Sequence, residues 1–298
     1  MIKKRITLVF ALILCCLSTK SLAQHADSSQ NYTRKAIIYT AAGSAFALSN
    51  YLLYQTWYAN YETAPFHAFD DSKEWLQMDK VGHITTAYYL SQLSYSALKW
   101  SGHSEKKAFI GSATGLLFLT SVEILDGFSR DWGFSWSDMA ANVLGTSLFM
   151  VQQKWLNKQV VQLKYSFHQT NYPNIRKDIL GNRLIEQTLK DYNGQTYWLC
   201  FSPFARKFSF IQLAFGYGAS GMLGGFDNIW FEDGQMINRS DIIRSRSFYF
   251  SLDIDWVKLF KKDESYFGPF RFVSFIKTPF PAMEYNTNNG LRFKPFYF

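Results

Sequence analysis

The sequence contains little cysteine, which limits how the fold can be stabilised. Its 298 residues include three cysteines, and Cys15 and Cys16 lie close to the N-terminus. If that N-terminal segment is removed, Cys200 alone remains, so no intrachain disulfide can form even in an oxidising compartment. The stability of the mature chain must therefore come from packing.

A strong net charge is also lacking. The formal net charge is +8, and taking away the four basic residues of the N-terminal leader leaves +4. Such a small excess does not indicate a nucleic-acid-binding protein. Aromatic residues are abundant instead, with 28 Phe and 18 Tyr. They gather in large cores and at membrane interfaces, so membrane lipid is the expected partner, whereas the composition identifies no protein partner.

The N-terminus has the pattern of a secretory signal peptide. Residues 3–5 are basic, Ile6–Leu17 is an apolar run, and small residues precede a cleavage point near Ala23. The run is shorter than the roughly 20 residues that a membrane span needs, so cleavage is favoured over retention. We expect a location in the periplasm or cell envelope. Lipidation at Cys15 or Cys16 is disfavoured, because the preceding residues lack the small side chains of a lipoprotein signal.

The remaining chain divides into a helical region and a strand-rich region. Long apolar runs dominate the first region, and apolar residues alternate with polar ones in the second. We expect an α+β protein with a signal peptide at 1–23, a helical domain at 24–156 and a strand-rich region at 157–298. The segments of the helical domain suit an antiparallel four-helix bundle that is membrane-associated or partly embedded: about Tyr32–Trp57, Lys80–Trp100, Glu105–Asp126 and Ser137–Leu156.

The strand-rich region has its clearest alternation in two places. Leu163–Phe167 and Phe248–Trp256 show the period of two that half-buried strands have. Phe208–Gly218 and Leu291–Phe298 are weaker strand candidates, and Leu184–Lys190 is predicted to be a short helix. The pattern therefore predicts a small sheet packed on or beside the helices.

Several polar residues are placed where the predicted helices begin or end. If consecutive helices run antiparallel, the start of the second, the end of the third and the start of the fourth lie together. Each position carries two polar residues at a spacing that puts them on one helix face: Asp79 with His83, Glu123 with Asp126, and Asp138 with Asn142. We therefore expect a single polar cluster, joined by Arg130 and Ser135 from the connection before the fourth helix.

Helix capping would explain part of this pattern. Asp79 and Asp138 could cap helix N-termini, where the helix dipole favours a carboxylate by roughly 0.3 to 1 kcal/mol. Ser135 with Asp138 also fits the capping-box spacing. Capping does not explain Glu123 and Asp126, because the dipole disfavours negative charge at a helix C-terminus. A positive group must compensate there, and the candidates are His83, Lys80, Arg130 or a metal ion.

The cluster allows two kinds of function. Carboxylates and an imidazole bind hard or borderline divalent metals, and the candidate ligands are His83, Glu123, Asp126 and Asp138. The sequence contains no HExxH or ExxH pair, which favours an ion-pair network over a metal site. The first hypothesis is a non-enzymatic envelope protein whose cluster fixes the bundle or binds a small ligand or ion.

The second hypothesis is a metal-assisted or histidine-based hydrolase that acts on lipid or on phosphorylated envelope precursors. His83 would be its general acid or base, and Asp79 and Glu123 would be its catalytic partners. The sequence leaves open whether the protein is an enzyme.

Three spaced motifs between about residues 75 and 155 carry a family resemblance. They are Asp79-Lys-Val-Gly-His83, Glu123-x-x-Asp126-Gly-x-Ser129 and Gly133-Phe-Ser135-x-x-Asp138-x-x-x-Asn142-x-x-Gly145. This pattern resembles the YfiM-like family of predicted periplasmic lipoproteins, a domain of unknown function, and more faintly the VanZ-like membrane family. The resemblance implies an envelope location and a polar cluster built from these positions, and it implies no established reaction.

The distribution of charge indicates how the helices would meet a membrane. Ala36–Trp57 is apolar enough to be a candidate span, and Glu105–Asp126 is nearly so. Basic residues should gather at the end opposite the carboxylates: Arg34, Lys35, Lys99, Lys106, Lys107, Lys154 and Lys158. With the signal peptide cleaved, that end would be on the wrong side for the positive-inside rule. A bundle that lies against the membrane from the periplasm, with its basic end on anionic lipid, removes the conflict.

Overall fold

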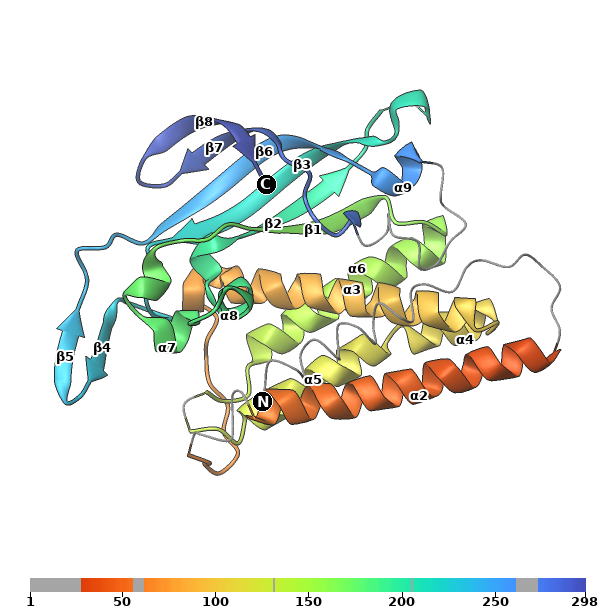
Figure 1. Ribbon diagram of the computed structural model, residues 1–298, viewed down its shortest axis with the longest axis horizontal. Coiled ribbons are helices and arrows are strands. Elements are labelled where there is room, and N and C mark those ends of the chain that lie inside the picture. Colours follow the sequence, from red (N-terminus) through yellow and green to blue (C-terminus); the bar gives the residue numbers. More distant parts are fainter. Residues whose placement is uncertain (1–27, 56–61, 131, 205, 261–272) are drawn as a thin grey trace.

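The protein consists of a helical layer and a layer formed by an antiparallel sheet (Figure 1). This computed structural model describes residues 28–55, 62–130, 132–204, 206–260 and 273–298. The expected α+β class, with the helices before the strands along the chain, is confirmed. The predicted signal peptide, its cleavage near Ala23 and the two N-terminal cysteines lie outside the described residues.

The third predicted helix is interrupted. The hydroxyl group of Ser112 donates a hydrogen bond to the carbonyl oxygen of Phe109 (2.6 Å), which competes with continued backbone bonding. Two helices form in place of one, so the expected four-helix bundle is not confirmed. The described helical layer contains α2 (Ser28–Leu53), α3 (Met78–Trp100), α4 (Glu105–Gly111), α5 (Thr114–Asp126) and α6 (Trp136–Leu156).

Contacts along α2 establish the directions of the helices. Tyr39 contacts His103, just beyond the end of α3, through a hydrogen bond of 2.7 Å, and Phe46 packs edge-to-face on Phe118 of α5. Near the start of α2, the guanidinium group of Arg34 lies 5.3 Å from the ring centre of Trp100. The helix α2 therefore runs in the same direction as α5 and opposite to α3. The start of α2 and the end of α3 lie together at one end of the helical layer.

The core of the helical layer lies between α3 and α6. Tyr88 and Tyr95 from α3 surround Phe149 from α6, and all three are buried. The two helices cross closely at Gly145, where a Cβ atom would collide with the carbonyl oxygen of Ile84. This absence of a side chain lets the start of α6 approach the start of α3, where the polar residues are.

The second layer is a six-stranded antiparallel sheet in the order β1-β2-β3-β6-β7-β8. A separate hairpin, β4 with β5, projects from the connection between β3 and β6. The strands are β1 (Val161–Phe167), β2 (Gln195–Phe201), β3 (Ile211–Ser220), β4 (Ile229–Glu232), β5 (Gln235–Asn238), β6 (Ser245–Ile254), β7 (Phe280–Asn286) and β8 (Gly290–Tyr297).

Each strand candidate from the sequence corresponds to a strand of this sheet, with its ends displaced by a few residues. The sequence reading missed β2, β4, β5 and β7. The predicted short helix is confirmed as α8 (Leu184–Lys190). Shorter helical segments complete the fold: η2 (Glu74–Gln77), η3 (Tyr172–Asn174), α7 (Lys177–Leu180), η4 (Tyr192–Gly194), η5 (Arg206–Phe208) and α9 (Trp256–Leu259).

The helix α3 joins the two layers. Its residue Tyr88 donates a hydrogen bond to the carbonyl oxygen of Val161 (3.4 Å), and Tyr89 donates to that of Leu163. At the other end of the helix, Met78 is fully buried against Ala219 and its neighbours on β3. The helix therefore lies across β1, β2 and β3, with its N-terminus beside the end of β3.

One helical segment in the described part of the chain has the length and the apolar composition of a membrane span, Glu105–Asp126. The sequence analysis favours Ala36–Trp57 over this segment as a membrane span. The part of that segment within α2 does not meet the same test, and its last two residues lie outside the described range.

Candidate functional site

The N-terminus of α3, the C-terminus of α5 and the N-terminus of α6 lie together. His83 on α3 is 3.6 Å from Glu123 on α5 and 3.9 Å from Asp138 on α6, measured between side-chain nitrogen and oxygen atoms. The structure thus brings together residues that are about 40 to 55 positions apart in the sequence. We call the group the polar cluster; it consists of Asp71, Asp79, Lys80, His83, Glu123, Asp138 and Asn142.

Lys80 is the central cation of the polar cluster. Its ammonium nitrogen lies 2.6 Å from Asp71, 3.0 Å from Asp79 and 2.8 Å from Asp138. Burial opposes the charged form of Lys80, but the charges of Asp79 and Asp138 outweigh it and raise its pKa. The positive group that the acidic side chains require is therefore this lysine, together with His83.

Asp71 belongs to the cluster although the sequence reading missed it. Ser135 and Ser137 donate hydrogen bonds to its Oδ1 atom at 2.5 and 2.6 Å. Burial works against ionisation of Asp71, but its hydrogen bonds with Asp138, Lys80 and these serines hold its pKa well below the ordinary value. Asp71 precedes η2, in irregular backbone without periodicity, so no sequence pattern pointed to it.

The structure does not use Asp79 or Asp138 as helix caps, although the sequence is compatible with both. Ser135 is the N-cap of α6, and its hydroxyl oxygen accepts a hydrogen bond from the backbone N–H of Asp138 (2.9 Å). The N-cap of α3 is Gln77, which makes no capping bond through its side chain. Neither Asp79 nor Asp138 is therefore a capping residue, and both carboxylates point into the cluster.

The orientation of His83 is set by Asn142. The Nδ1 atom of His83 lies 3.0 Å from the amide oxygen of Asn142, an acceptor, so Nδ1 carries a proton. The Nε2 atom is turned toward Asp79 at 3.7 Å and Asp138 at 3.9 Å. Burial opposes protonation of the ring, but Asp79, Asp138 and Glu123 outweigh it and raise the pKa of His83.

Two acidic groups in the cluster hold their protons unusually strongly. Burial, reinforced by Asp138, Asp126 and Asp79, raises the pKa of Glu123 to about 8, and the positive charge of His83 only partly opposes it. Burial and the charge of Asp79 raise the pKa of Asp138 to about 7. The cluster therefore exchanges protons close to neutral pH, as binding and catalytic sites commonly do.

Some buried atoms of the cluster lack hydrogen-bond partners. Glu123 is 1% exposed and Asn142 is 0% exposed. In the described part of the molecule, Glu123 Oε1 and Asn142 Nδ2 have no hydrogen-bond partner. Such atoms are rare in folded proteins because each costs free energy when it is taken out of water. Their presence beside His83 indicates a site that can receive a ligand or an ion.

The arrangement fits a divalent metal ion. Asp79, His83 and Asp138 each offer a ligand atom, and these three atoms lie within 4.8 Å of one another. The set differs from the metal ligands considered from the sequence, since Asp79 takes part and Glu123 lies on the opposite side of the imidazole ring, near Nδ1. The hydroxyl group of Tyr192 donates to Asp79 (2.8 Å) and fixes its orientation.

One residue expected in the cluster, Arg130, lies outside it. Arg130 pairs instead with Glu62, and both side chains are mostly exposed. Asp126 is half-buried at the end of α5 and acts on Glu123 through its charge. The connection between α5 and α6 carries Arg130 outward. The ion-pair network expected around His83 and Arg130 is therefore centred on His83 and Lys80.

A pocket of about 340 Å³ adjoins the cluster. Its lining includes Phe69, Trp136 and Ser137, and Ser137 is also a hydrogen-bond partner of Asp71. The Trp136 side chain in this pocket is largely exposed. The pocket therefore offers an apolar surface next to the polar groups.

Comparisons with known proteins identify one family. Residues 67–154 match the family described as predicted periplasmic lipoprotein (DUF2279). Every motif residue that carried the resemblance to the YfiM-like family lies inside this segment, so that resemblance is confirmed. No curated protein and no solved structure gives a significant match.

Proposed function

Because residues 67–154 match a family of predicted periplasmic lipoproteins, we propose a cell-envelope protein that lies against a membrane and binds a divalent cation in its polar cluster. The ligands are Asp79, His83 and Asp138. The observation that carries this proposal is the approach of their ligand atoms, from two helices, to within 4.8 Å of one another. Two carboxylates and an imidazole suit zinc, manganese and related divalent ions.

The second layer of contacts supports coordination through His83 Nε2. Metal-binding histidines usually donate their other ring N–H to an oxygen atom, which fixes the tautomer. The amide oxygen of Asn142 provides that acceptor at 3.0 Å from Nδ1. A bound cation would displace the Nε2 proton and compete with Lys80 for Asp79 and Asp138. Binding should therefore strengthen as the pH rises.

The surface of the helical layer supports membrane association. Large apolar side chains on its helices are exposed: Ile37, Phe46, Leu48, Leu52, Leu93, Ile110, Leu117, Ile124, Val143, Leu144, Val151 and Trp155. Exposed apolar side chains in this number on neighbouring helices support a membrane or a partner as what covers them. The start of α2 and the end of α3 bring basic residues to one end, where they would meet anionic lipid. The match to a family of predicted periplasmic lipoproteins supports a membrane as the environment of these exposed side chains.

Cation binding can be measured directly. We expect the purified full chain, stripped with a chelator, to take up a single zinc or manganese ion in calorimetry and metal analysis. Asp138→Asn and His83→Ala should abolish detectable uptake, and Asn142→Ala should weaken it about 10- to 100-fold. Arg130→Ala is the matched control and should bind like the wild type, because Arg130 lies outside the cluster. A folded wild-type protein that takes up neither ion would refute the proposal.

Hydrolysis is the second candidate, favoured by the apolar pocket of about 340 Å³ beside the cluster. In that case the substrate would be a lipid or a phosphorylated envelope precursor. Either a cation held by Asp79, His83 and Asp138 would activate water, or His83 would transfer protons without a cation. Wild type and His83→Ala should then differ in the release of phosphate or fatty acid from lipid substrates. If wild type and His83→Ala release these products at the same background rate, while the wild type still binds the cation, cation binding remains the proposed function and hydrolysis is excluded.

A further inference from the structure

The two faces of the six-stranded sheet have opposite characters, and the pairing register shows it. On one face, residues in register across β2, β3, β6, β7 and β8 are all apolar: Leu199, Phe215, Phe250, Met283 and Phe293. The neighbouring row on the same face is Tyr197, Tyr217, Phe248, Tyr285 and Leu291. These rows, with Leu213 and Leu252 beside them, form what we call the outer face.

Much of the outer face is open. The helix α3, with η2 before it, covers the part over β1, β2 and the end of β3, where Tyr217 donates to the carbonyl oxygen of Leu76. Beyond it, Phe215, Phe248 and Phe250 are 46 to 47% exposed, and Phe293 is 62% exposed. No charged residue occurs in the two rows. An apolar surface of this extent is unusual on a protein that is fully surrounded by water.

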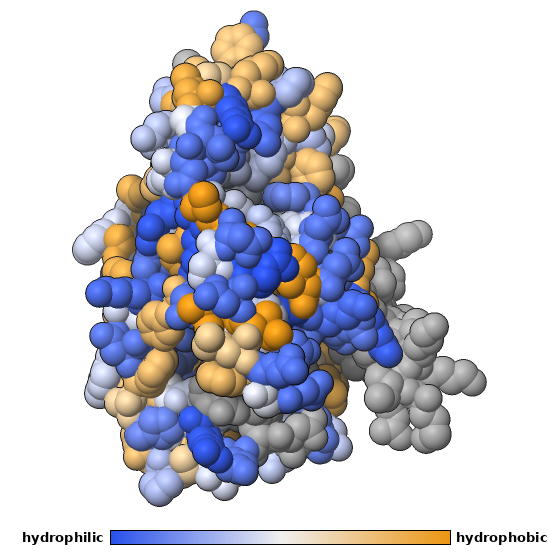
Figure 2. Space-filling view, turned by 90° about the vertical axis from the view of Figure 1, so that its left-hand side faces the viewer, coloured by the Kyte–Doolittle hydropathy of each residue, from blue (hydrophilic) through white to orange (hydrophobic). Residues whose placement is uncertain are grey.

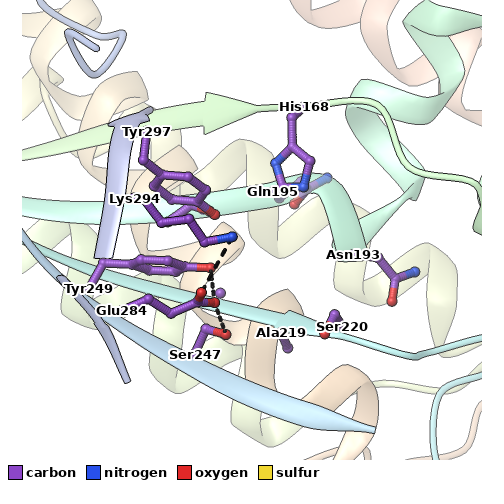
Figure 3. A pocket seen from close by; sticks show the side chains of 12 residues that line it. His168, Asn193, Gln195, Ala219, Ser220, Ser247, Tyr249, Glu284, Lys294 and Tyr297 are labelled. Atoms are coloured by element: carbon purple, nitrogen blue, oxygen red, sulfur yellow. Dashed lines mark hydrogen bonds and ion pairs between the residues drawn. The ribbon is translucent and has the colours of Figure 1, made fainter. Parts of the chain in front are cut away.

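The opposite, inner face of the sheet is buried, and it combines many polar groups with an apolar cluster of Trp198, Cys200, Ala214 and Tyr249. Lys164 and Asp253 are fully buried and form an ion pair at 2.5 Å, and Lys164 also donates to the carbonyl oxygen of Ile254 (2.8 Å). Farther along the same face, Ser247 and Tyr249 donate to Glu284 at 2.8 and 3.0 Å, and Lys294 lies 3.4 Å away (Figure 3). A cavity of about 180 Å³ opens beside these groups. They satisfy one another, which lets this face be enclosed.

The sheet curls to enclose that face. The backbone N–H of Tyr165 in β1 donates to Phe275 (2.9 Å), and that of Lys277 donates to Tyr165 (3.0 Å). The segment that leads into β7 thereby pairs with the free edge of β1 at the other side of the sheet. Lys277 is fully buried and lies 4.9 Å from the ring centre of Trp198 on the inner face. The curl keeps the buried charged residues inside and leaves the two apolar rows of the outer face outside.

We propose that the outer face of β3, β6, β7 and β8 inserts into the hydrocarbon of a membrane, so that the sheet binds lipid as well as the helices. The hydrophobic effect places apolar surface inside when the solvent is water, and here the face with the buried charged groups is inside while two uncharged apolar rows are exposed. A lipid environment reverses that preference, because apolar side chains are then well solvated outside. This inference rests on the envelope location in the proposed function.

The dimensions favour insertion from one side. The apolar residues of the outer face on β6 run from Phe248 to Ile254, about 20 Å at the rise of a strand. The hydrocarbon core is roughly 30 Å thick. The end of the molecule that carries β4 and β5 is largely hydrophilic in its middle, with hydrophobic residues scattered among the hydrophilic ones (Figure 2). That hydrophilic end would stay in water.

A protein partner is the less suitable occupant. Interfaces between proteins are about as polar as the rest of the surface outside their centres and contain charged residues at their rim. The two in-register rows contain neither charges nor amides across five strands. Lipid chains match such a surface, since they offer no polar group to pair with it.

Vesicle binding tests the proposal. The full chain should float with vesicles of phosphatidylethanolamine and phosphatidylglycerol, and Phe248→Ser with Phe250→Ser should lower its partitioning by at least about tenfold. The matched control is Ile185→Ser with Leu189→Ser, which removes two equally exposed side chains from α8. The control should bind vesicles like the wild type. Equal partitioning of the Phe248/Phe250 variant and the wild type would overturn the proposal.

A second measurement covers the case in which that variant does not fold. An environment-sensitive fluorophore at Leu252→Cys, with Cys200→Ala, should shift to the blue and be quenched by spin-labelled lipid when vesicles are added. The same label at Asn288→Cys, in the β7–β8 turn, should remain in water. A blue shift at position 252 without vesicles, together with a dimer in solution, would show that a second copy covers the face and would refute lipid insertion.

The two proposals fail separately. Phe248→Ser with Phe250→Ser leaves the polar cluster intact, so it should take up the divalent ion like the wild type. Asp138→Asn removes a cation ligand and should leave vesicle flotation unchanged. Loss of both properties in one variant would indicate unfolding, which circular dichroism detects.

Discussion

The helical layer and the sheet both bury charged groups, but they arrange them differently. In the helical layer the charges gather at one end, where Lys80 and His83 meet carboxylates from three segments of the chain. In the sheet the polar residues extend along a whole face, as the pair between Lys164 and Asp253 and the contacts of Glu284 illustrate. Helix ends concentrate polar groups at a point, and a strand distributes them along a line.

Both layers contain buried polar atoms without hydrogen-bond partners in the described structure: those of Gln212 in the sheet, and those of Glu123 and Asn142 in the helical layer. The latter lie on the Nδ1 side of His83, whereas Nε2 faces Asp79 and Asp138. In the sheet, Lys164 has both an ion-pair partner and a carbonyl acceptor. A polar group that is held by its neighbours stabilises a fold. The candidate site is placed in the helical layer because the ligand atoms of Asp79, His83 and Asp138 lie within 4.8 Å of one another there.

Breaking the buried pair in the sheet should have the largest effect. Lys164→Met leaves Asp253 charged and without its partner in a fully buried position, which costs about 3 to 5 kcal/mol of the free energy of unfolding. Urea denaturation measures it. Lys164→Met with Asp253→Leu removes both charges and should recover most of the loss. If the single variant unfolds like the wild type, the pair is not the structural element we describe.

The polar cluster should make stability depend on pH. The folded-state pKa of Glu123 is about 8, above its ordinary value of 4.5, so folding favours the protonated carboxyl group. Its contribution is complete below pH 4.5 and is lost as the pH rises through about 8. With a chelator present, the free energy of unfolding should fall over this range, and Glu123→Gln should reduce the slope. Glu62→Gln, an exposed control, should not. Parallel profiles for wild type and Glu123→Gln would contradict the burial of a titrating Glu123.

The smallest effect is expected at the surface. The side chains of Arg130 and Glu62 are 65% and 74% exposed, and pairs of that kind contribute roughly 0 to 1 kcal/mol. Arg130→Met should therefore change the midpoint of thermal unfolding little. A loss comparable to that of Lys164→Met would show that Arg130 supports the cluster after all, as the sequence suggested.

The sequence was informative wherever a local rule applies. Helix periodicity placed His83, Glu123 and Asp138 on the three helix ends, and capping chemistry identified Ser135 at the start of α6. Prediction from the sequence failed where the backbone is irregular and the residues show no helical or strand periodicity. Asp71 lies in irregular backbone just before residues 75–77, which have positive φ angles, and the path of the connection that carries Arg130 outward follows no pattern. The sequence identifies both Lys80 and Arg130 as candidate cations for the acidic residues. It does not show which of the two contacts them.

The sheet shows a further limit of sequence reasoning. Alternation with a period of two establishes that Phe248, Phe250 and Leu252 share one face and Tyr249, Ser251 and Asp253 the other. It does not establish which face is enclosed, and here the enclosed face is the one that carries Asp253 and Lys164. That choice depends on the curl of the sheet and on the pairing of Tyr165 with the segment before β7.

The sequence by itself determined that the helices precede the strands along the chain and which residue types lie at each helix end, because hydrophobic period and capping act over a few residues. Only the tertiary structure decided that Lys80 would be the common partner of three carboxylates and that the aromatic face of the sheet would turn outward. Both depend on contacts between distant segments, made possible by the close approach of α6 to α3 at Gly145 and by the closure of the sheet edge at Tyr165. Electrostatic and packing energies fall steeply with distance, so these choices exist only after the chain has folded.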